Sequence, residues 1–237
     1  MRLLAVETST SESSVALALD DGAVHDEPLP SGRLQTETLM AAIDRLLRRC
    51  GVAVRALEGF AVAVGPGAFI GVRVGIATVK GLALATGKAV VPISTLEALA
   101  RRATEIEQSE AEPPRLICAM LDARRGEVYA ACYRPSGQDG LERVGEERLI
   151  RPEVWVRELT GPALFVGDGA RLHRAAILER LGQAASFPAA DIVAPGAAAV
   201  ARLALGRWAE GAIDPAEVTA VYLRPAVEAR SPEITHT

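Results

Sequence analysis

Short apolar runs, separated by residues that favour turns, dominate the first half of the chain. Such runs predict buried strands, whereas apolar residues that recur every three or four positions predict helices. Asp20-Asp21-Gly22 is typical of a tight hairpin turn between two strands. The predicted elements are strands at 3–6, 14–19 and 23–27, a helix at 39–50, a strand at 60–64, a helix at 69–86, a strand at 89–91 and a helix from 94 to about 106.

The second half repeats this order of elements without repeating the sequence. Its predicted elements are strands at 116–121, 127–133 and 141–150, the start of a helix at 152–159, a strand at 163–166, a helix at 171–181, a weak strand at 191–193 and a helix at 197–210. Both halves therefore follow the pattern β-β-β-α-β-α-β-α.

Two stacked copies of this unit form the architecture of actin, hexokinase and the Hsp70 ATPase domain. The predicted fold class is therefore α/β, an actin-like/Hsp70-like ATPase (ASKHA) fold with two tandem βββαβαβα subdomains. The polar, proline-containing stretch at 105–114 is expected to separate them. The predicted subdomains are 1–107 and 108–237, the second ending in a short flexible tail from about residue 226.

The helix predicted at 69–86 is apolar almost all round, because only Arg73 and Lys80 interrupt it with charge. A helix with one face in water normally has a broad polar face. Gly71 and Gly75 would let another helix approach closely. Burial within the chain and contact with a partner protein both explain this pattern, and we favour the partner.

Two predicted hairpin turns carry candidate chemistry. The turn from Glu7 to Ser14 is rich in hydroxyl groups, which either bind phosphate and a cation or satisfy their own backbone; we favour the second. The turn from Asp122 to Glu127 carries two arginines, which either form ion pairs across the hairpin or face a phosphate or a partner. The candidate nucleotide-binding residues are Thr8, Ser9, Asp122 and Arg124.

Composition narrows the function classes. The net charge of −4 comes without a basic block, so electrostatics alone do not predict nucleic-acid binding. The three cysteines fit no zinc-binding spacing and favour a reducing compartment, and the scattered histidines form no metal-binding pair. We expect no metal site and no catalytic residue. The apolar tract at 69–87 contains two charges and is expected to fall short of a membrane span, so a cytoplasmic protein without membrane contact is predicted.

Several motifs together resemble the family of bacterial tRNA threonylcarbamoyladenosine biosynthesis proteins called TsaB or YeaZ. The resemblance is carried by Leu-Leu-Ala-Val-Glu-Thr-Ser-Thr at 3–10, Gly-Pro-Gly-Ala-Phe-Ile-Gly-Val-Arg-Val-Gly at 65–75, Lys-Gly-Leu-Ala at 80–83, Ser-Thr-Leu-Glu-Ala-Leu-Ala at 94–100, Asp-Ala-Arg-Arg-Gly-Glu-Val-Tyr at 122–129 and Val-Tyr-Leu-Arg at 221–224. Glu7 and Ile70 depart from the family pattern, which often has aspartate and threonine there.

The resemblance implies an actin-like, non-catalytic scaffold subunit. Its implied partners are the catalytic paralogue TsaD, which transfers a threonylcarbamoyl group to the adenosine beside the anticodon of tRNA, and the ATPase TsaE. In a homodimer, the chain would use the same surface with which it binds TsaD. It would reach tRNA only through the complex. The resemblance implies no cofactor for this chain itself. ATP and a divalent metal would bind in the assembled complex.

The resemblance also places the partner surface on the first two helices, at about 33–50 and 69–86. The implied partner-binding residues are Thr36, Leu39, Met40, Ile43, Ile70, Gly71, Arg73, Val74, Gly75 and Thr78. The stretch at 34–39 lacks the histidine pair with which the catalytic paralogue holds its metal, which supports a non-catalytic role. The alternative is an ATP-dependent small-molecule kinase or ATPase of the same fold, with nucleotide near Thr8, Ser9 and Asp122.

Overall fold

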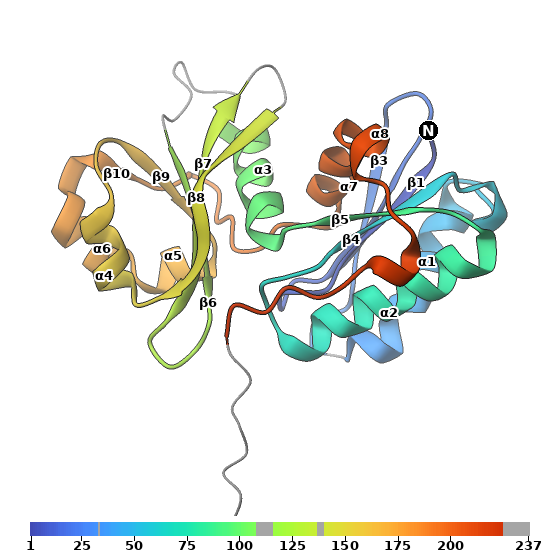
Figure 1. Ribbon diagram of the computed structural model, residues 1–237, viewed down its shortest axis with the longest axis horizontal. Coiled ribbons are helices and arrows are strands. Elements are labelled where there is room, and N and C mark those ends of the chain that lie inside the picture. Colours follow the sequence, from blue (N-terminus) through green and yellow to red (C-terminus); the bar gives the residue numbers. More distant parts are fainter. Residues whose placement is uncertain (33, 108–115, 137–139, 225–237) are drawn as a thin grey trace, which may run out of the picture.

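The structure is a computed structural model that describes residues 1–32, 34–107, 116–136 and 140–224. It contains two five-stranded mixed sheets, seen apart from each other in Figure 1. The strands of the first sheet are β1 (Leu3–Glu7), β2 (Ser14–Ala18), β3 (Val24–Pro28), β4 (Gly59–Ala63) and β5 (Val90–Ile93). Those of the second sheet are β6 (Ile117–Asp122), β7 (Val128–Ser136), β8 (Gly140–Ile150), β9 (Ala163–Val166) and β10 (Ala185–Ser186).

The two sheets share one topology. The first has the order β3-β2-β1-β4-β5 and the second, written in the same direction, β8-β7-β6-β9-β10. In each sheet the first strand pairs antiparallel with the second and parallel with the fourth. The repeat expected from the order of elements is therefore present, and the predicted actin-like fold class is confirmed.

Helices cover both faces of each sheet, which explains why β1, β2 and β4 are buried along their whole length. Alternate residues of β1 face opposite layers: Leu4 and Val6 pack with α1 and α2, whereas Leu3 and Ala5 pack with α7. The helices are α1 (Gln35–Arg49), α2 (Phe69–Thr86), α3 (Thr95–Glu107), α4 (Pro152–Glu158), α5 (Asp168–Leu172), α6 (Arg174–Leu181), α7 (Ala197–Gly206) and α8 (Trp208–Gly211), with single 3-10 turns η1 (Val54–Ala56), η2 (Gly182–Ala184) and η3 (Pro215–Glu217).

Two helices cross between the halves of the sequence. Helix α3 packs on β6 and β7 of the second sheet, whereas α7 packs on β1, β2 and β4 of the first. We call the first sheet with α1, α2 and α7 the first lobe, and the second sheet with α3 to α6 the second lobe. A cut between residues 107 and 108 separates the sheets but not the helices that cover them. The boundary stretch predicted at 105–114 begins within α3, which continues to Glu107, and its remainder and the tail from 226 lie outside the described residues.

Some predicted elements of the second half are wrong. Residues 191–193 form no strand: the carbonyls of Ile192 and Val193 accept hydrogen bonds from Gly167 and Asp168 beyond the end of β9, and the fifth strand is β10 instead. The helix predicted at 171–181 is divided into α5 and α6 at His173, whose ψ of 16° departs from helical geometry.

The glycines of α2 face the chain's own sheet. A Cβ atom on Gly71 would lie 2.0 Å from the backbone oxygen of Thr8, and one on Gly75 would lie 2.3 Å from Oγ1 of Thr8. The Thr8 hydroxyl donates to the carbonyl of Gly71 at 2.8 Å. These glycines therefore let α2 approach the end of β1, and the expectation that they admit a partner helix is wrong.

Helix α2 is, by length and composition alone, long and apolar enough to cross a membrane, so the expectation that this tract falls short is wrong on that criterion. Its buried residues nevertheless pack in the core of the first lobe: Val72 and Val79 lie in one cluster with Leu4 and Val6 of β1. The core helix of a water-soluble domain passes the same test.

Replacing Gly75 with leucine is expected to lower the free energy of unfolding by about 1–3 kcal/mol, because the added side chain would overlap Thr8 and Val6. The matched control is Gly81→Ala in the same helix, where an added Cβ meets no atom within 4 Å. That change is expected to raise the free energy of unfolding by about 1 kcal/mol through helix propensity. Urea unfolding of both variants measures these changes in the free energy of unfolding. An unchanged unfolding midpoint for Gly75→Leu would contradict the packing of Gly75 against the first sheet.

Candidate functional site

A cleft of about 690 Å³ lies where the two lobes meet. It is bordered by the turn after β1, the start of α2, the hairpin between β6 and β7, the start of α5 and a C-terminal segment. Ser9, Asp122 and Arg124, all expected at a nucleotide site, line it. Its full lining is Ser9, Thr10, Ser11, Pro66, Gly67, Ala68, Phe69, Arg73, Leu121, Asp122, Ala123, Arg124, Tyr129, Asp168, Val221, Tyr222, Leu223 and Arg224.

The turn after β1 is held by its own hydrogen bonds. The Glu7 carboxylate is fully buried and accepts from the amide (2.7 Å) and the hydroxyl of Ser9 and from the hydroxyl of Thr10 (3.1 Å). Thr95 at the start of α3 donates to the Ser9 hydroxyl at 3.0 Å. Thr8 is fully buried with its hydroxyl donated to Gly71, so its expected place in a nucleotide site is wrong. The turn satisfies itself, as favoured from the sequence.

The hairpin between β6 and β7 is unusual in its backbone. Arg124 and Arg125 have φ angles of 63° and 59°, a left-handed conformation that costs a residue with a side chain roughly 1–2 kcal/mol. Oδ1 of Asp122 accepts from the amide of Arg124 at 2.8 Å, and Oδ2 lies 3.1 Å from its guanidinium. The ion pair expected within this hairpin is therefore present, while the Arg124 side chain stays exposed at the cleft.

Asp168, at the start of α5 in the same lobe, holds this hairpin. Its Oδ1 accepts from the backbone amide of Asp122 at 2.9 Å. Burial raises the pKa of Asp168 above its ordinary value, against the effect of the hydrogen bonds from Asp122 and Gly169. Sequence patterns did not single out Asp168, because its contact joins the ends of β6 and β9 and depends on their pairing.

A C-terminal segment, residues 218–224, crosses from the first lobe to the second and is visible in Figure 1 as a red coil running from the first lobe toward the second. We call it the strap. The amide of Val221 donates to the carbonyl of Val64 at 2.8 Å, and Arg224 donates to the carbonyl of Ala123 at 2.7 Å. Arg224 also forms an ion pair with Glu127 at 2.9 Å. The strap thereby joins the end of β4 to the hairpin of the second lobe.

The strap also contacts α2. The rings of Phe69 and Tyr222 have centroids 5.4 Å apart, and the guanidinium carbon of Arg73 lies 3.4 Å from the Phe69 centroid and 5.2 Å from that of Tyr222. Further along α2, Lys80 donates to the carbonyls of Ala216 and Val218, each at 3.1 Å. Both charges of α2 therefore hold this C-terminal stretch.

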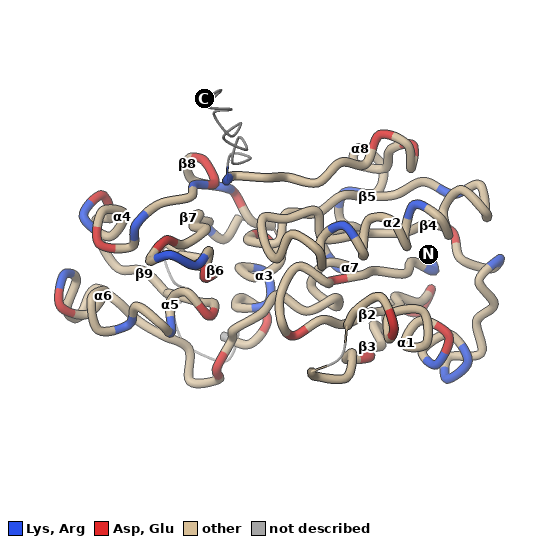
Figure 2. The backbone as a smooth tube through the Cα atoms, turned by 90° about the horizontal axis from the view of Figure 1, so that it is seen from below, with Lys and Arg blue, Asp and Glu red and all other residues tan. Residues whose placement is uncertain are grey.

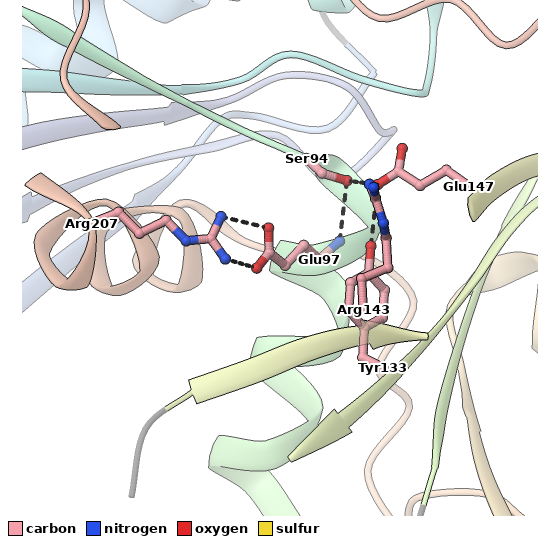
Figure 3. A network of polar contacts seen from close by, with 6 residues as sticks. All are labelled: Ser94, Glu97, Tyr133, Arg143, Glu147 and Arg207. Atoms are coloured by element: carbon pink, nitrogen blue, oxygen red, sulfur yellow. Dashed lines mark hydrogen bonds and ion pairs between the residues drawn. The ribbon is translucent and has the colours of Figure 1, made fainter. Parts of the chain in front are cut away.

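A polar network ties α3 to the second sheet and to the end of α7 (Figure 3). The Ser94 hydroxyl donates to Glu147 of β8, which also accepts from the Tyr133 hydroxyl at 3.2 Å. Glu97 forms a two-fold ion pair with Arg207, one bond being 2.8 Å long. Burial, with Glu147 nearby, raises the pKa of Tyr133 well above its ordinary value. The phenol is thus a neutral donor in this joint.

Large apolar side chains are exposed at the start of α2 and, at Met40, on α1. Ile70, Phe69 and Met40 have 68%, 57% and 52% of their surface exposed. Of the implied partner-binding residues, those on the surface of α1 and α2 that faces away from the sheet, which we call the outer face, are Thr36, Met40, Ile70 and Arg73, which are exposed, and Val74 and Thr78, which are half-buried. The remaining ones, Leu39, Ile43, Gly71 and Gly75, are buried within the first lobe, so their implied role in partner contact is wrong.

Charged residues are scattered over both lobes without forming a single basic or acidic block, as Figure 2 shows. Among the described residues, no group of three or more histidine, cysteine, aspartate or glutamate side chains is close enough to hold a metal ion.

Comparison with known proteins agrees with the motifs. A family model described as TsaD, tRNA N6-adenosine threonylcarbamoyltransferase, matches residues 26–204. The tRNA threonylcarbamoyladenosine biosynthesis protein TsaB of Haemophilus influenzae is 30% identical over 96% of this chain and 95% of its own length. TsaB of Escherichia coli is 34% identical over 71% of this chain and 72% of its own.

Solved structures give the same picture. YeaZ from Pseudomonas aeruginosa superimposes with a TM-score of 0.79 at 32% identity, covering 94% of this chain and 99% of its own. The (R)-2-hydroxyglutaryl-CoA dehydratase component A of Acidaminococcus fermentans, with a TM-score of 0.50 at 9% identity, shares the fold alone over 89% of this chain and 100% of its own.

The buried Glu7 gives this site a measurable pH dependence. Burial raises its pKa above the ordinary value of 4.5, more than the hydrogen bonds from Ser9 and Thr10 lower it. The folded state then holds this proton more tightly than the unfolded state, so its contribution to stability is full below pH 4.5 and is lost as the pH rises through the folded-state pKa.

Glutamine at position 7 keeps the neutral form at every pH. As the pH is raised from about 4 to about 8, the wild type is expected to lose unfolding free energy relative to Glu7→Gln, so the difference between them shifts in favour of the variant. The control is Glu12→Gln in the same turn, where the side chain is exposed. Urea unfolding across this pH range measures the difference, and parallel curves for wild type and Glu7→Gln would contradict it.

Proposed function

Because the chain belongs to the TsaB family, whose role lies in tRNA threonylcarbamoyladenosine biosynthesis, we propose that it is the non-catalytic subunit that binds and activates the catalytic paralogue TsaD. The observation that carries this proposal is the outer face of α1 and α2. Ile70, Phe69 and Met40 are large apolar side chains with more than half of their surface exposed, and exposed apolar side chains that gather on one face mark interaction sites.

The composition of the outer face suits a protein partner. Ile70 and Met40 provide apolar contacts at its centre, and Arg73 is an arginine already desolvated on one side by the ring of Phe69. Aromatic, methionine and arginine side chains are enriched in protein interfaces. Because the inward face of α2 is fixed by its glycines, partner binding would require no rearrangement of the first lobe.

The interior of the cleft supports a role without chemistry of its own. The hydroxyls of Thr8 and Ser9 are donated to Gly71 and Glu7, and Asp122 is engaged by its own hairpin. A phosphate at the first turn would have to compete with the buried carboxylate of Glu7, so the first turn does not fit a nucleotide phosphate.

The wider assembly follows from the same proposal. The ATPase TsaE joins the complex, ATP and a divalent metal act within it, and tRNA is reached through it. In the absence of TsaD, two copies of this chain pair through the outer face as a homodimer. The complex operates in the cytoplasm.

A second candidate, a small-molecule kinase or ATPase, is favoured by one observation. The cleft between the lobes has the size of a ligand pocket and lies where this fold places nucleotide. Arg124 and Asp168 are among the charged residues that line it.

The two candidates differ in what the outer face does. Ile70→Asp is expected to weaken TsaD binding at least tenfold, about 1.4 kcal/mol, because it places a charge in a buried interface. The position lies in the first turn of α2, where an acid is compatible with the helix dipole, so folding is preserved. Isothermal titration with purified TsaD measures the affinity.

The matched control is Leu172→Asp, since Leu172 is exposed to a similar degree, 63% against 68%, but lies on the second lobe. It is expected to bind TsaD normally, and both variants should unfold at the wild-type temperature. Equal affinities for the two variants would rule out the outer face as the interface.

Nucleotide titration and reconstitution separate the scaffold from the kinase. The isolated chain is expected to turn over no ATP, and addition of the chain to TsaD and TsaE is expected to restore tRNA modification. Tight ATP binding by the isolated chain, weakened by Arg124→Ala and accompanied by turnover of a small substrate, would favour the kinase.

A further inference from the structure

Strands β6 and β7 bring two buried cysteines face to face. Cys118 and Cys132 are direct partners in the antiparallel ladder, and their sulfur atoms are 3.4 Å apart. Cys118 is completely buried and Cys132 is 7% exposed. Neither residue takes part in the cleft or the outer face.

A pair of buried cysteines often serves only as two small apolar side chains. This pair in addition comes near the placement that a disulfide requires. The Cβ atoms of directly opposed residues in an antiparallel ladder are about 4.5–5.5 Å apart, those of a disulfide are about 3.5–4.5 Å apart, and the two sulfur atoms already lie within 3.4 Å of each other. The sulfur atoms need to approach by roughly 1.4 Å to reach the bond length of about 2.05 Å.

The local backbone can supply that movement. The pairing of β7 with β8 shifts register between Ala130 and Cys132, so Cys132 lies beside an irregularity in the ladder rather than within an unbroken run of pairs. The sulfur atoms already make a thiol–sulfur contact within hydrogen-bonding distance.

We infer that Cys118 and Cys132 are a modification site that forms a reversible intrachain disulfide when the chain is exposed to a peroxide. Cys132 is the first to react because it is the more exposed. Its thiol loses a proton, and the thiolate attacks a peroxide oxygen. The O–O bond breaks, a sulfenic acid forms at Cys132, and for hydrogen peroxide the leaving hydroxide takes up a proton equivalent to the one that the thiol released, which gives one water.

The sulfur of Cys118 then attacks the sulfur of the sulfenic acid, the S–O bond breaks, and the oxygen leaves as a second water. In total two thiols are oxidised to one disulfide and one peroxide is reduced to two waters. Burial raises the pKa of Cys118, which slows the second step but does not change its direction. Reduction by a dithiol reverses the whole sequence.

The disulfide would close a ring that includes the hairpin between β6 and β7. The segment between the cysteines contains the hairpin with Asp122 and Arg124, which line the cleft. Tyr133, the neighbour of Cys132, donates to Glu147 in the joint between α3 and the second sheet. Oxidation would therefore stiffen the hairpin and stabilise the second lobe by restricting its unfolded state.

Cys50 provides an internal control. It lies at the end of α1 in the first lobe and is partly exposed. It would be oxidised by the same reagent without forming the ring, so the full-length Cys50→Ser variant isolates the pair. Cys50→Ser/Cys118→Ser is the matched control that lacks one partner.

The test treats both variants with hydrogen peroxide, quenches with catalase and alkylates in denaturant, followed by peptide mapping by mass spectrometry. Cys50→Ser is expected to lose both thiols and to give a linked peptide pair containing Cys118 and Cys132. Dithiothreitol should restore both thiols. The oxidised form should also unfold at higher urea concentration than the reduced form.

Cys50→Ser/Cys118→Ser is expected to give no linked peptide and no such shift in urea. The inference is overturned if Cys118 and Cys132 remain thiols after treatment that oxidises Cys50 in the wild type. It is also overturned if Cys132 proceeds to sulfinic acid without a linked peptide. Neither outcome bears on TsaD binding, so the scaffold proposal stands or falls separately.

Discussion

The close contact between Gly71 and Gly75 of α2 and Thr8 at the end of β1 fixes which side of α2 faces the first sheet. It brings the helix close enough for the Thr8 hydroxyl to donate to the carbonyl of Gly71. Next to this contact, the amide of Ala68 donates to the backbone carbonyl of Ser9 at 2.7 Å. The start of α2 and the first hairpin turn are therefore fixed together. With this side of the helix committed to its own sheet, Ile70 and Arg73 are left on the outside.

The same arrangement connects the outer face to the cleft. Phe69 and Arg73 belong to both, since they border the cleft and also contact Tyr222 of the strap. The strap, the exchanged helices α3 and α7, and the network around Ser94 and Glu147 all join the two lobes. A movement of one lobe relative to the other would have to break several of these contacts.

The order of elements and the fold class were predictable because each depends on local patterns. Helix α2 begins and ends where predicted, since Gly87 adopts the left-handed conformation typical of a helix end. The direction of the glycine face was not predictable, because an almost uniformly apolar helix has no polar side to mark its outside. For α1 the pattern did contain the answer: Leu39 and Ile43 recur at core spacing and are core residues, despite their implied role at the interface.

The cleft was predictable only in part. Ser9, Asp122 and Arg124 were placed there correctly because hairpin turns of the repeated unit meet between the lobes. The sequence did not predict that Tyr222, Arg224 and Asp168 line the cleft, although the motif at 221–224 carries part of the family resemblance. Their contacts join segments far apart in the sequence, and only the packed structure brings them together.

Carbene footprinting of the isolated chain and of its mixture with TsaD tests directly whether the outer face is the interface. Met40 and Ile70 are expected to be strongly labelled in the isolated chain and to lose that labelling with TsaD, while Leu172 is labelled equally in both. Unchanged labelling of Met40 and Ile70 in a mixture that reconstitutes tRNA modification would exclude the outer face as the TsaD-binding surface.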